Sequence, residues 1–181
     1  MIDGTRSRLI ESALTLLREQ GLEGVTLRAV GELAGLSRMA PYRHFADKKA
    51  LLAAVAARVM TDIAAHIAAA VLPQSGQEER LRAFYRSYVE YAVEHPEEYR
   101  LVFSSMFVAG RHPEVEQAID EIMSALSVDI AGGGRRDKAA LAALLASAHG
   151  VAELVTVGDF AHKGIGADDI IDVMVSRAAR P

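Results

Sequence analysis

Cysteine is absent from the 181 residues. Without thiols the chain cannot form a disulfide framework, a thiolate metal site or a thiol redox switch. Alternating runs of β-branched and aromatic residues are also missing, whereas alanine and leucine dominate a composition that is 51% hydrophobic. The dominance of alanine and leucine, together with the missing alternating runs, predicts an all-α fold.

Sequence patterns for catalysis and metal binding are missing as well. The six histidines stand at positions 44, 66, 95, 112, 149 and 162, so no two are three or four apart and no helix presents two imidazoles on one face. No glycine-rich phosphate loop and no nucleophile elbow around a serine occurs. We therefore expect no cofactor, no metal site and no catalytic residues, and a protein that is not an enzyme.

Long uncharged segments are few. Residues 51–72 are apolar but contain Arg58, Asp62 and His66, one turn apart on a single face. The run 139–152 has 14 residues without Asp, Glu, Lys or Arg, fewer than the roughly 20 that a membrane span needs. Residues 1–4 are polar and short, so we expect no signal peptide. These features predict a soluble, cytoplasmic protein without a membrane partner.

Residues 25–34 have the pattern of a short helix. Thr26 can cap its first turn, with Val25 and Val30 closing over the cap. Four apolar residues follow at spacings that we interpret as one buried face: Leu27, Val30, Leu33 and Ala34. Gly35 can take the left-handed conformation that ends a helix.

A second short helix is predicted from Ser37, its expected N-cap, to His44. The turn between the two helices would then be residues 35–37 only, and such a short turn makes helices cross steeply, as in helix-turn-helix DNA readers. Leu36, Pro41 and Phe45 are expected to point inward. The open side would carry Arg38, Met39, Tyr42, Arg43 and His44.

Positive charge is concentrated in the same stretch. Residues 28–49 contain five basic and two acidic residues, a net charge of +3 in a chain whose total is −4. Phosphate binding requires such a local excess of positive charge. The interpretation from the residues alone is therefore a nucleic-acid-binding head on an acidic protein.

The pattern from Thr26 to Leu52 resembles the N-terminal domain of the TetR family of bacterial transcriptional regulators. The resemblance is carried by Thr26, by residues 34–37 (AGLS), by residues 42–45 (YRHF), and by Lys48 with Leu51 and Leu52. Met39 and Pro41 depart from the commonest form of the pattern. Both lie in the predicted base-reading helix, so the operator sequence of other members does not carry over.

We expect nine residues of this segment to contact DNA. Base-edge contacts are assigned to Arg28, Arg38 and Met39, and Arg43 belongs to the same open face. Backbone contacts that position the helix without reading sequence are assigned to Thr26, Ser37, Tyr42, His44 and Lys48.

The remaining chain predicts a larger helical domain. We expect a first helix over 6–20 ended by Gly21, a linking helix over 47–72, and further helices over 78–94, 97–108, 114–131, 135–156 and 167–179. The expected domains are a helix-turn-helix domain at 1–46, completed by the start of the linking helix, and a ligand-binding and dimerisation domain at 47–181.

Aromatic residues concentrate where a helical bundle could leave a cavity. Seven of the ten phenylalanines and tyrosines lie between residues 84 and 107. Ordinary core packing is the alternative for each of them, and His149 could instead cap a carbonyl of a neighbouring helix. The candidate pocket residues for a small-molecule effector are Phe84, Tyr88, Tyr91, Tyr99, Phe103, Met106, Phe107, Met123 and His149.

The last two predicted helices are rich in small and apolar residues, which favours a four-helix interface between two copies of the chain. Residues 95–103 (HPEEYRLVF) together with His149 and Gly150 resemble a TetR subgroup named for a Trp-His-Gly motif, although Ala148 stands where that tryptophan would be. The resemblance thus covers most of the chain.

This resemblance implies a ligand-responsive repressor that binds a palindromic operator as a homodimer. A small molecule in the bundle would release it by tilting the linking helix and changing the spacing of the two reading helices. Two alternatives stay open. One is a helical adaptor whose basic head meets an acidic protein, and the other is a helical-bundle enzyme using Glu153, Asp159 and His149.

Overall fold

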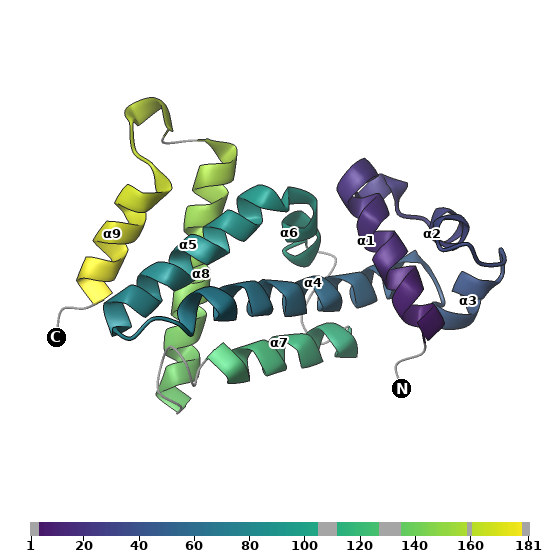
Figure 1. The fold of residues 1–181 in the computed structure, drawn as a ribbon, viewed down its shortest axis with the longest axis horizontal. Coiled ribbons are helices and arrows are strands. Elements are labelled where there is room, and N and C mark those ends of the chain that lie inside the picture. The colour runs from purple at the N-terminus through teal and green to yellow at the C-terminus, as the bar shows by residue number, and fades with distance from the viewer. Residues whose placement is uncertain (1–3, 105–111, 127–134, 159–160, 179–181) are drawn as a thin grey trace. The chain divides into compact units, whose positions relative to one another are not determined.

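The computed structural model describes residues 4–104, 112–126, 135–158 and 161–178, and every regular element in these ranges is a helix (Figure 1). The all-α prediction is therefore confirmed. The helices are α1 (Gly4–Gly24), α2 (Leu27–Leu33), α3 (Ala40–His44), α4 (Lys48–Val71), α5 (Gln77–Glu94), α6 (Pro96–Val102), α7 (Pro113–Leu126), α8 (Arg135–Val157) and α9 (Ala167–Ala178), with a short 3₁₀ helix at Ala161–Lys163.

The chain divides into two compact units. The first comprises Met1–Met60 with Glu97–Ile119, and the second comprises Thr61–Pro96 with Asp120–Pro181. Helices α4 and α7 each contribute residues to both units. These are units of backbone packing, so the functional division after residue 46 stays a prediction.

Helix α1 is the support of the first unit. Its buried residues Leu9, Ala13, Leu16 and Leu17 recur at helical spacing, and it packs against α2 and α3. Gly21 has a φ of 67°, which confirms the expected break, but helical hydrogen bonding resumes and continues to Gly24.

The predicted caps of α2 are confirmed. The hydroxyl of Thr26 accepts a hydrogen bond from the backbone N–H of Ala29 at 3.1 Å. At the other end Gly35 has a φ of 65°, and the N–H of Leu36 donates to the carbonyl of Gly31 at 3.0 Å. This is the left-handed glycine stop that satisfies the last carbonyls of a helix.

The predicted inward face of α2 is wrong for Leu33, whose exposed fraction is 51%. Successive residues of a helix are about 100° apart, so Leu27, Val30 and Ala34 share one side with Gly31 while Leu33 lies well off it. Gly31, rather than Leu33, is the buried fourth member of that face.

The second helix of the motif is shorter than predicted. It begins at Ala40, and residues 38–39 form a turn in which the N–H of Ala40 donates to the carbonyl of Ser37 at 2.9 Å. The predicted Ser37 cap is wrong because the first α-helical bond to Ser37 would need an N–H on Pro41, which proline lacks. Pro41 instead lies in the first turn of α3, where the missing N–H is tolerated.

The linking helix is confirmed as α4, and the side chain of Asp47 caps it by accepting from the N–H of Ala50 at 2.8 Å. It ends at Val71, one residue before the predicted end. The prediction of a helix over 97–108 is wrong at its C-terminal side, since α6 ends at Val102 and a turn follows at 103–104. Residues 105–108 lie outside the described part of the chain.

The second unit is built around α5, which packs against α8 and α9 (Figure 1). Phe84 of α5, Leu141 of α8 and Ile171 of α9 are all buried to 1% exposure or less. A hydroxyl pair adds to this core, because the Tyr85 hydroxyl oxygen lies 2.9 Å from the Ser147 hydroxyl oxygen.

Two helices of the described chain are long and apolar enough to cross a membrane by length and composition alone. They are Lys48–Val71 and the Ala139–Val157 part of α8. The core helix of a soluble protein passes the same test, so this finding is weak support for a span.

Candidate nucleic-acid interface

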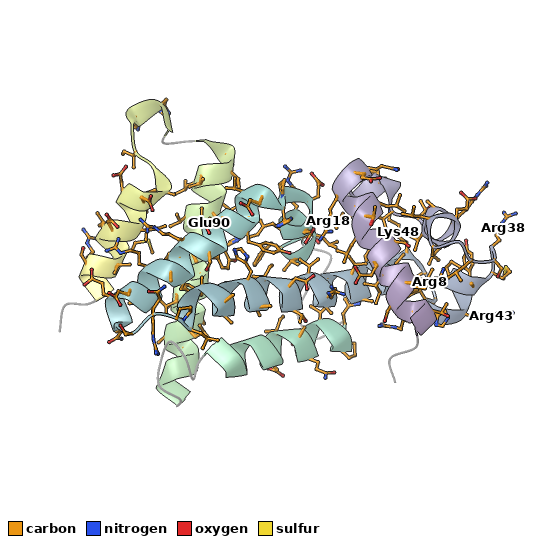
Figure 2. All side chains as sticks on the ribbon, viewed as in Figure 1. Arg8, Arg18, Arg38, Arg43, Lys48 and Glu90 are labelled. Carbon is orange, nitrogen blue, oxygen red and sulfur yellow. The ribbon has the colours of Figure 1, made fainter. Side chains whose placement is uncertain are left out.

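The turn before α3 and α3 itself separate an inner side from an outer side. Pro41 and Phe45 are buried, as predicted, whereas Met39 and Tyr42 have exposed fractions of 60% and 50%. Arg38 and Arg43 extend away from the ribbon of the same segment (Figure 2). A large exposed methionine and tyrosine beside two guanidinium groups form a face suited to base edges and phosphates.

The crossing of α2 and α3 depends on Gly31. An ideal Cβ at this position would lie 2.8 Å from Cγ of Pro41, closer than two carbon atoms can approach. The proline ring therefore packs directly on the backbone of α2. The sequence pattern did not reveal this role of Gly31, although a glycine inside a helix often marks such a close approach.

Three basic side chains hold the helices of the first unit together. Arg8 donates to the carbonyl of Ala34 at 2.6 Å, and Lys48 donates to the carbonyl of Leu22 at 2.9 Å. The guanidinium carbon of Arg6 lies 5.3 Å from the centre of the Phe45 ring. The Lys48 ammonium, predicted to bind phosphate, thus already joins the start of α4 to the end of α1.

Arg28 and Glu32 form an exposed ion pair one turn apart on α2. Nε of Arg28 lies 2.9 Å from a carboxylate oxygen of Glu32. This hydrogen bond and the charge of Glu32 raise the pKa of the Arg28 guanidinium, and the nearby Tyr42 adds a smaller electrostatic contribution of the same sign. The pair thus lies on the exposed side of α2, the helix that packs against α3.

The other predicted DNA contacts are spread over the same unit. Thr26 and Ser37 are exposed and His44 is partly buried. The Thr26 hydroxyl accepts the capping hydrogen bond, and its own proton can still be donated to a phosphate.

The predicted effector pocket is divided between the two units. Phe84, Tyr88 and Tyr91 lie in the second unit and are at most 5% exposed, with the rings of Phe84 and Tyr88 6.2 Å apart. Tyr99 and Phe103 lie in the first unit with ring centres 4.7 Å apart.

The other predicted pocket residues are less enclosed or lie outside the described residues. Phe103 is 46% exposed, so its own unit does not enclose this side chain as a pocket would. Its predicted role in a pocket stays a prediction. His149 is partly buried on α8. Met106, Phe107 and the side chain of Met123 lie outside the described residues.

His66 is a polar group of the second unit that was not among the predicted site residues. Its ring centre lies 5.7 Å from that of Tyr91, which in turn lies 4.6 Å from the ring centre of His95. Nε2 of His66 is buried and has no hydrogen-bond partner within the described residues. Buried polar atoms in proteins are normally paired, so an unpaired one requires an explanation.

A shallow groove of about 450 Å³ also belongs to the second unit. Its lining comes from the end of α4, the turn that follows and residues 79–90 of α5, and it contains alanines as well as charged side chains. No group of three or more potential metal ligands occurs in the ranges that the structure describes.

Comparison with family models matches two segments of the chain. Residues 9–55 match the model described as "Bacterial regulatory proteins, tetR family". Residues 81–178, more than half of the chain, match "Tetracyclin repressor-like, C-terminal domain". The second match includes residues 95–103, His149 and Gly150, which carried the resemblance of the C-terminal half.

Curated relatives align over part of their length. The chain is 43% identical over 56 residues to the tetracycline repressor protein class C of Escherichia coli and 24% identical over 106 residues to the HTH-type transcriptional activator FasR of Mycolicibacterium smegmatis. These alignments span 26% and 48% of the two relatives. The chain thus matches at most about half the length of these proteins.

Solved structures share the fold over nearly the whole chain. A protein with unknown function from Rhodococcus sp. RHA1 is 27% identical with a TM-score of 0.79, covering 97% of this chain and 93% of that one. A putative tetR family transcription regulator from Shewanella sp. PV-4 is 16% identical with a TM-score of 0.70, covering 97% and 98%. With both halves matched by family models, the chain belongs to the TetR family of bacterial regulatory proteins.

Proposed function

We propose that the protein is a cytoplasmic, ligand-responsive transcriptional repressor that binds a palindromic operator as a homodimer. The observation that carries the proposal is the outer face of the segment 38–43. There Arg38, Met39, Tyr42 and Arg43 are all exposed on a turn and helix whose inner side is fixed by Pro41 and Phe45.

Rigid mounting of this face is what DNA reading requires. Base contacts discriminate only when side chains are held in register with the groove. The capped ends of α2 and the packing of Pro41 on Gly31 supply that rigidity. The net charge of +3 over residues 28–49 supplies the attraction for phosphate.

Dimerisation is proposed to use α8 and α9. One face of the described part of α8 is apolar and exposed. It carries Ala139, Ala143, Ala146, Gly150 and Val157. A Cβ at Gly150 would meet nothing within 4 Å among the described residues, so their packing does not account for a glycine in mid-helix. Close approach of the same helix from a second copy would account for both features.

Effector binding is proposed for the second unit. An apolar core with a few polar groups is typical of small-molecule pockets. The buried Nε2 of His66, beside Tyr91, would offer one hydrogen bond to such a ligand. Helix α4 has residues in both units, which makes it a route by which ligand binding could alter the spacing of the two reading helices.

Selection of bound sequences from random duplex DNA by the purified full chain tests the DNA-binding half of the proposal. We expect a palindrome whose half-sites are about 10 base pairs apart, centre to centre, or a multiple of that distance. Failure of any sequence to be enriched over the starting pool would contradict it.

The sensing half is tested with the selected duplex and a panel of apolar compounds that carry one or two hydrogen-bonding groups. At least one compound is expected to weaken duplex binding in wild type but less so in a His66→Phe variant. A ligand must favour one of two states to shift their populations. Duplex affinity that no bound compound changes would refute the sensing proposal while leaving DNA binding intact.

A further inference from the structure

Glu32 is an acidic residue in the basic segment 28–49, and it has no role in capping a helix of the described chain. Residues 28–49 contain two acids, Glu32 and Asp47. Asp47 has a structural role, since its carboxylate accepts the N–H of Ala50 at 2.8 Å and caps α4. Among the residues that the structure describes, the Glu32 carboxylate caps no helix and accepts one side-chain hydrogen bond, from Arg28 at 2.9 Å.

Helix stability does not account for this ion pair. Arg28 lies in the first turn of α2 and Glu32 in the last, so each charge has the same sign as the helix-dipole end beside it. The order with the basic residue N-terminal to the acidic one is also the weaker orientation for a pair one turn apart. Both side chains are about two-thirds exposed, at 67% and 65%, where ion pairs add little to stability.

The negative charge of Glu32 by itself is also unfavourable for DNA binding. A carboxylate near the phosphates lowers affinity by repulsion. Glu32 is exposed on α2, the helix that packs against the reading helix α3, so its carboxylate belongs to the surface of the DNA-reading segment. An acid is therefore retained in a segment where neutral or basic residues would bind phosphate better.

The geometry of the pair suggests a use for the acid. A guanidinium group has five N–H donors on a planar fork. Glu32 engages the Nε–H, so with respect to the described part of the chain the edge formed by the two terminal nitrogens stays available. Two parallel N–H groups on this edge can donate to the two acceptors of a guanine in the major groove, O6 and N7.

We propose that Glu32 is a positioning residue that orients Arg28 to read a guanine in the operator, which rests on the proposed function. It holds one edge of the guanidinium and turns the other edge outward. Arg28 then enters the complex already ordered, and less conformational freedom is lost on binding. Glu32 adds specificity while slightly lowering affinity for DNA in general.

The expected effects differ between specific and general binding. Replacing Arg28 by alanine removes a bidentate base contact, which lowers discrimination at one base pair by roughly five- to 150-fold. In Glu32→Ala the arginine stays but is no longer ordered, so discrimination at that same base pair falls by about two- to ten-fold. Affinity for a random duplex stays equal or increases, because a negative charge has been removed.

The experiment measures binding of the full chain to the selected duplex, to duplexes changed at one base pair at a time, and to a random duplex. The variants are Arg28→Ala, Glu32→Ala, Glu32→Gln and the double alanine variant. Glu19→Gln controls for the loss of one acid from the same unit. Glu78→Ala controls for breaking another ion pair one turn apart, with Arg82 on α5.

The proposal predicts that Glu32→Ala and Arg28→Ala lose discrimination at the same base pair, with the double variant no worse than Arg28→Ala. Glu32→Gln keeps an oxygen acceptor for Nε and retains more discrimination than Glu32→Ala. Neither control changes the preference at any base pair.

Two results would overturn the positioning role alone. Full discrimination in Glu32→Ala would do so, and so would an equal loss of affinity on every duplex, which indicates a structural role. Wild-type protein that shows no preference among duplexes would overturn the proposed function and this inference together.

Discussion

Arg18 of α1 donates a hydrogen bond through Nε to the carboxylate of Glu98 on α6, and that carboxylate is completely buried. The two residues are 80 positions apart in sequence and belong to the same compact unit. A buried carboxylate is tolerated when it is paired. This pair therefore fastens α6 to the helix that supports the DNA-reading segment.

Loss of the Arg18 partner should destabilise the first unit. Arg18→Ala leaves the Glu98 carboxylate without this buried hydrogen bond, and we expect the free energy of unfolding to fall by about 1–3 kcal/mol, because half of the Arg18 side chain is exposed. Urea unfolding followed by circular dichroism measures the change. Arg100→Ala, which breaks an exposed pair with Glu97, should have an effect below about 0.5 kcal/mol.

Gly31→Ala should disturb the crossing of α2 and α3. The added methyl group would lie too close to the Pro41 ring, so we expect a loss of about 1–3 kcal/mol in stability and weaker binding to the selected duplex. The second change Pro41→Ala removes the ring and should restore part of both. Gly4→Ala, where the new methyl group meets nothing within 4 Å, is the control. Gly31→Ala with unchanged duplex affinity would argue against this packing role.

Lys48→Met should affect both folding and DNA binding. Its ammonium group donates to the Leu22 carbonyl, so stability should decrease by about 1 kcal/mol. If the same group also approaches a phosphate, the slope of log affinity against log salt becomes shallower by about one unit, equally on all duplexes. A stability loss without a change of slope would show that Lys48 acts only within the protein.

Arg38→Ala should instead relax the preference at one base pair while the others are kept. Competition with singly substituted duplexes measures this. Equal losses on the selected and on a random duplex would remove Arg38 from the base-reading residues.

Gly150→Leu should separate the proposed dimer. A large side chain on the exposed small-residue face of α8 would keep a second helix from close approach. Light scattering after size-exclusion chromatography should show a smaller mass than wild type. Ala65→Leu, at an exposed position of α4, should leave the mass unchanged. A dimeric Gly150→Leu protein would show that this face is not the interface.

Local signals in the sequence predicted the helix-turn-helix well. Thr26 and Gly35 act through backbone groups within five residues, so spacing alone identifies them. The start of α3 was mispredicted because the missing N–H of Pro41 outweighed the capping propensity of Ser37. The exposure of Leu33 was mispredicted for a related reason. In a helix of only seven residues, the spacing of the apolar positions does not define the buried side uniquely.

Long-range contacts could not be predicted from spacing. Glu98 stands in the charged sequence PEEYR, which suggests an exposed helix start, yet its partner Arg18 comes from α1. Likewise the aromatic residues between 84 and 107 form one cluster in the sequence. In the structure, however, Phe84, Tyr88 and Tyr91 belong to the second unit, and Tyr99 and Phe103 belong to the first. Tertiary packing, and not residue type, separates them.

The central claim is that the exposed basic face of residues 28–49 binds and reads DNA. The most direct measurement is the affinity of the full chain for its selected palindrome and for a scrambled duplex, over a salt series from about 50 to 200 mM. We expect a steep decrease in affinity with salt on both duplexes and tighter binding to the palindrome at every salt concentration. A shallow salt dependence with equal affinity for the two duplexes would contradict it.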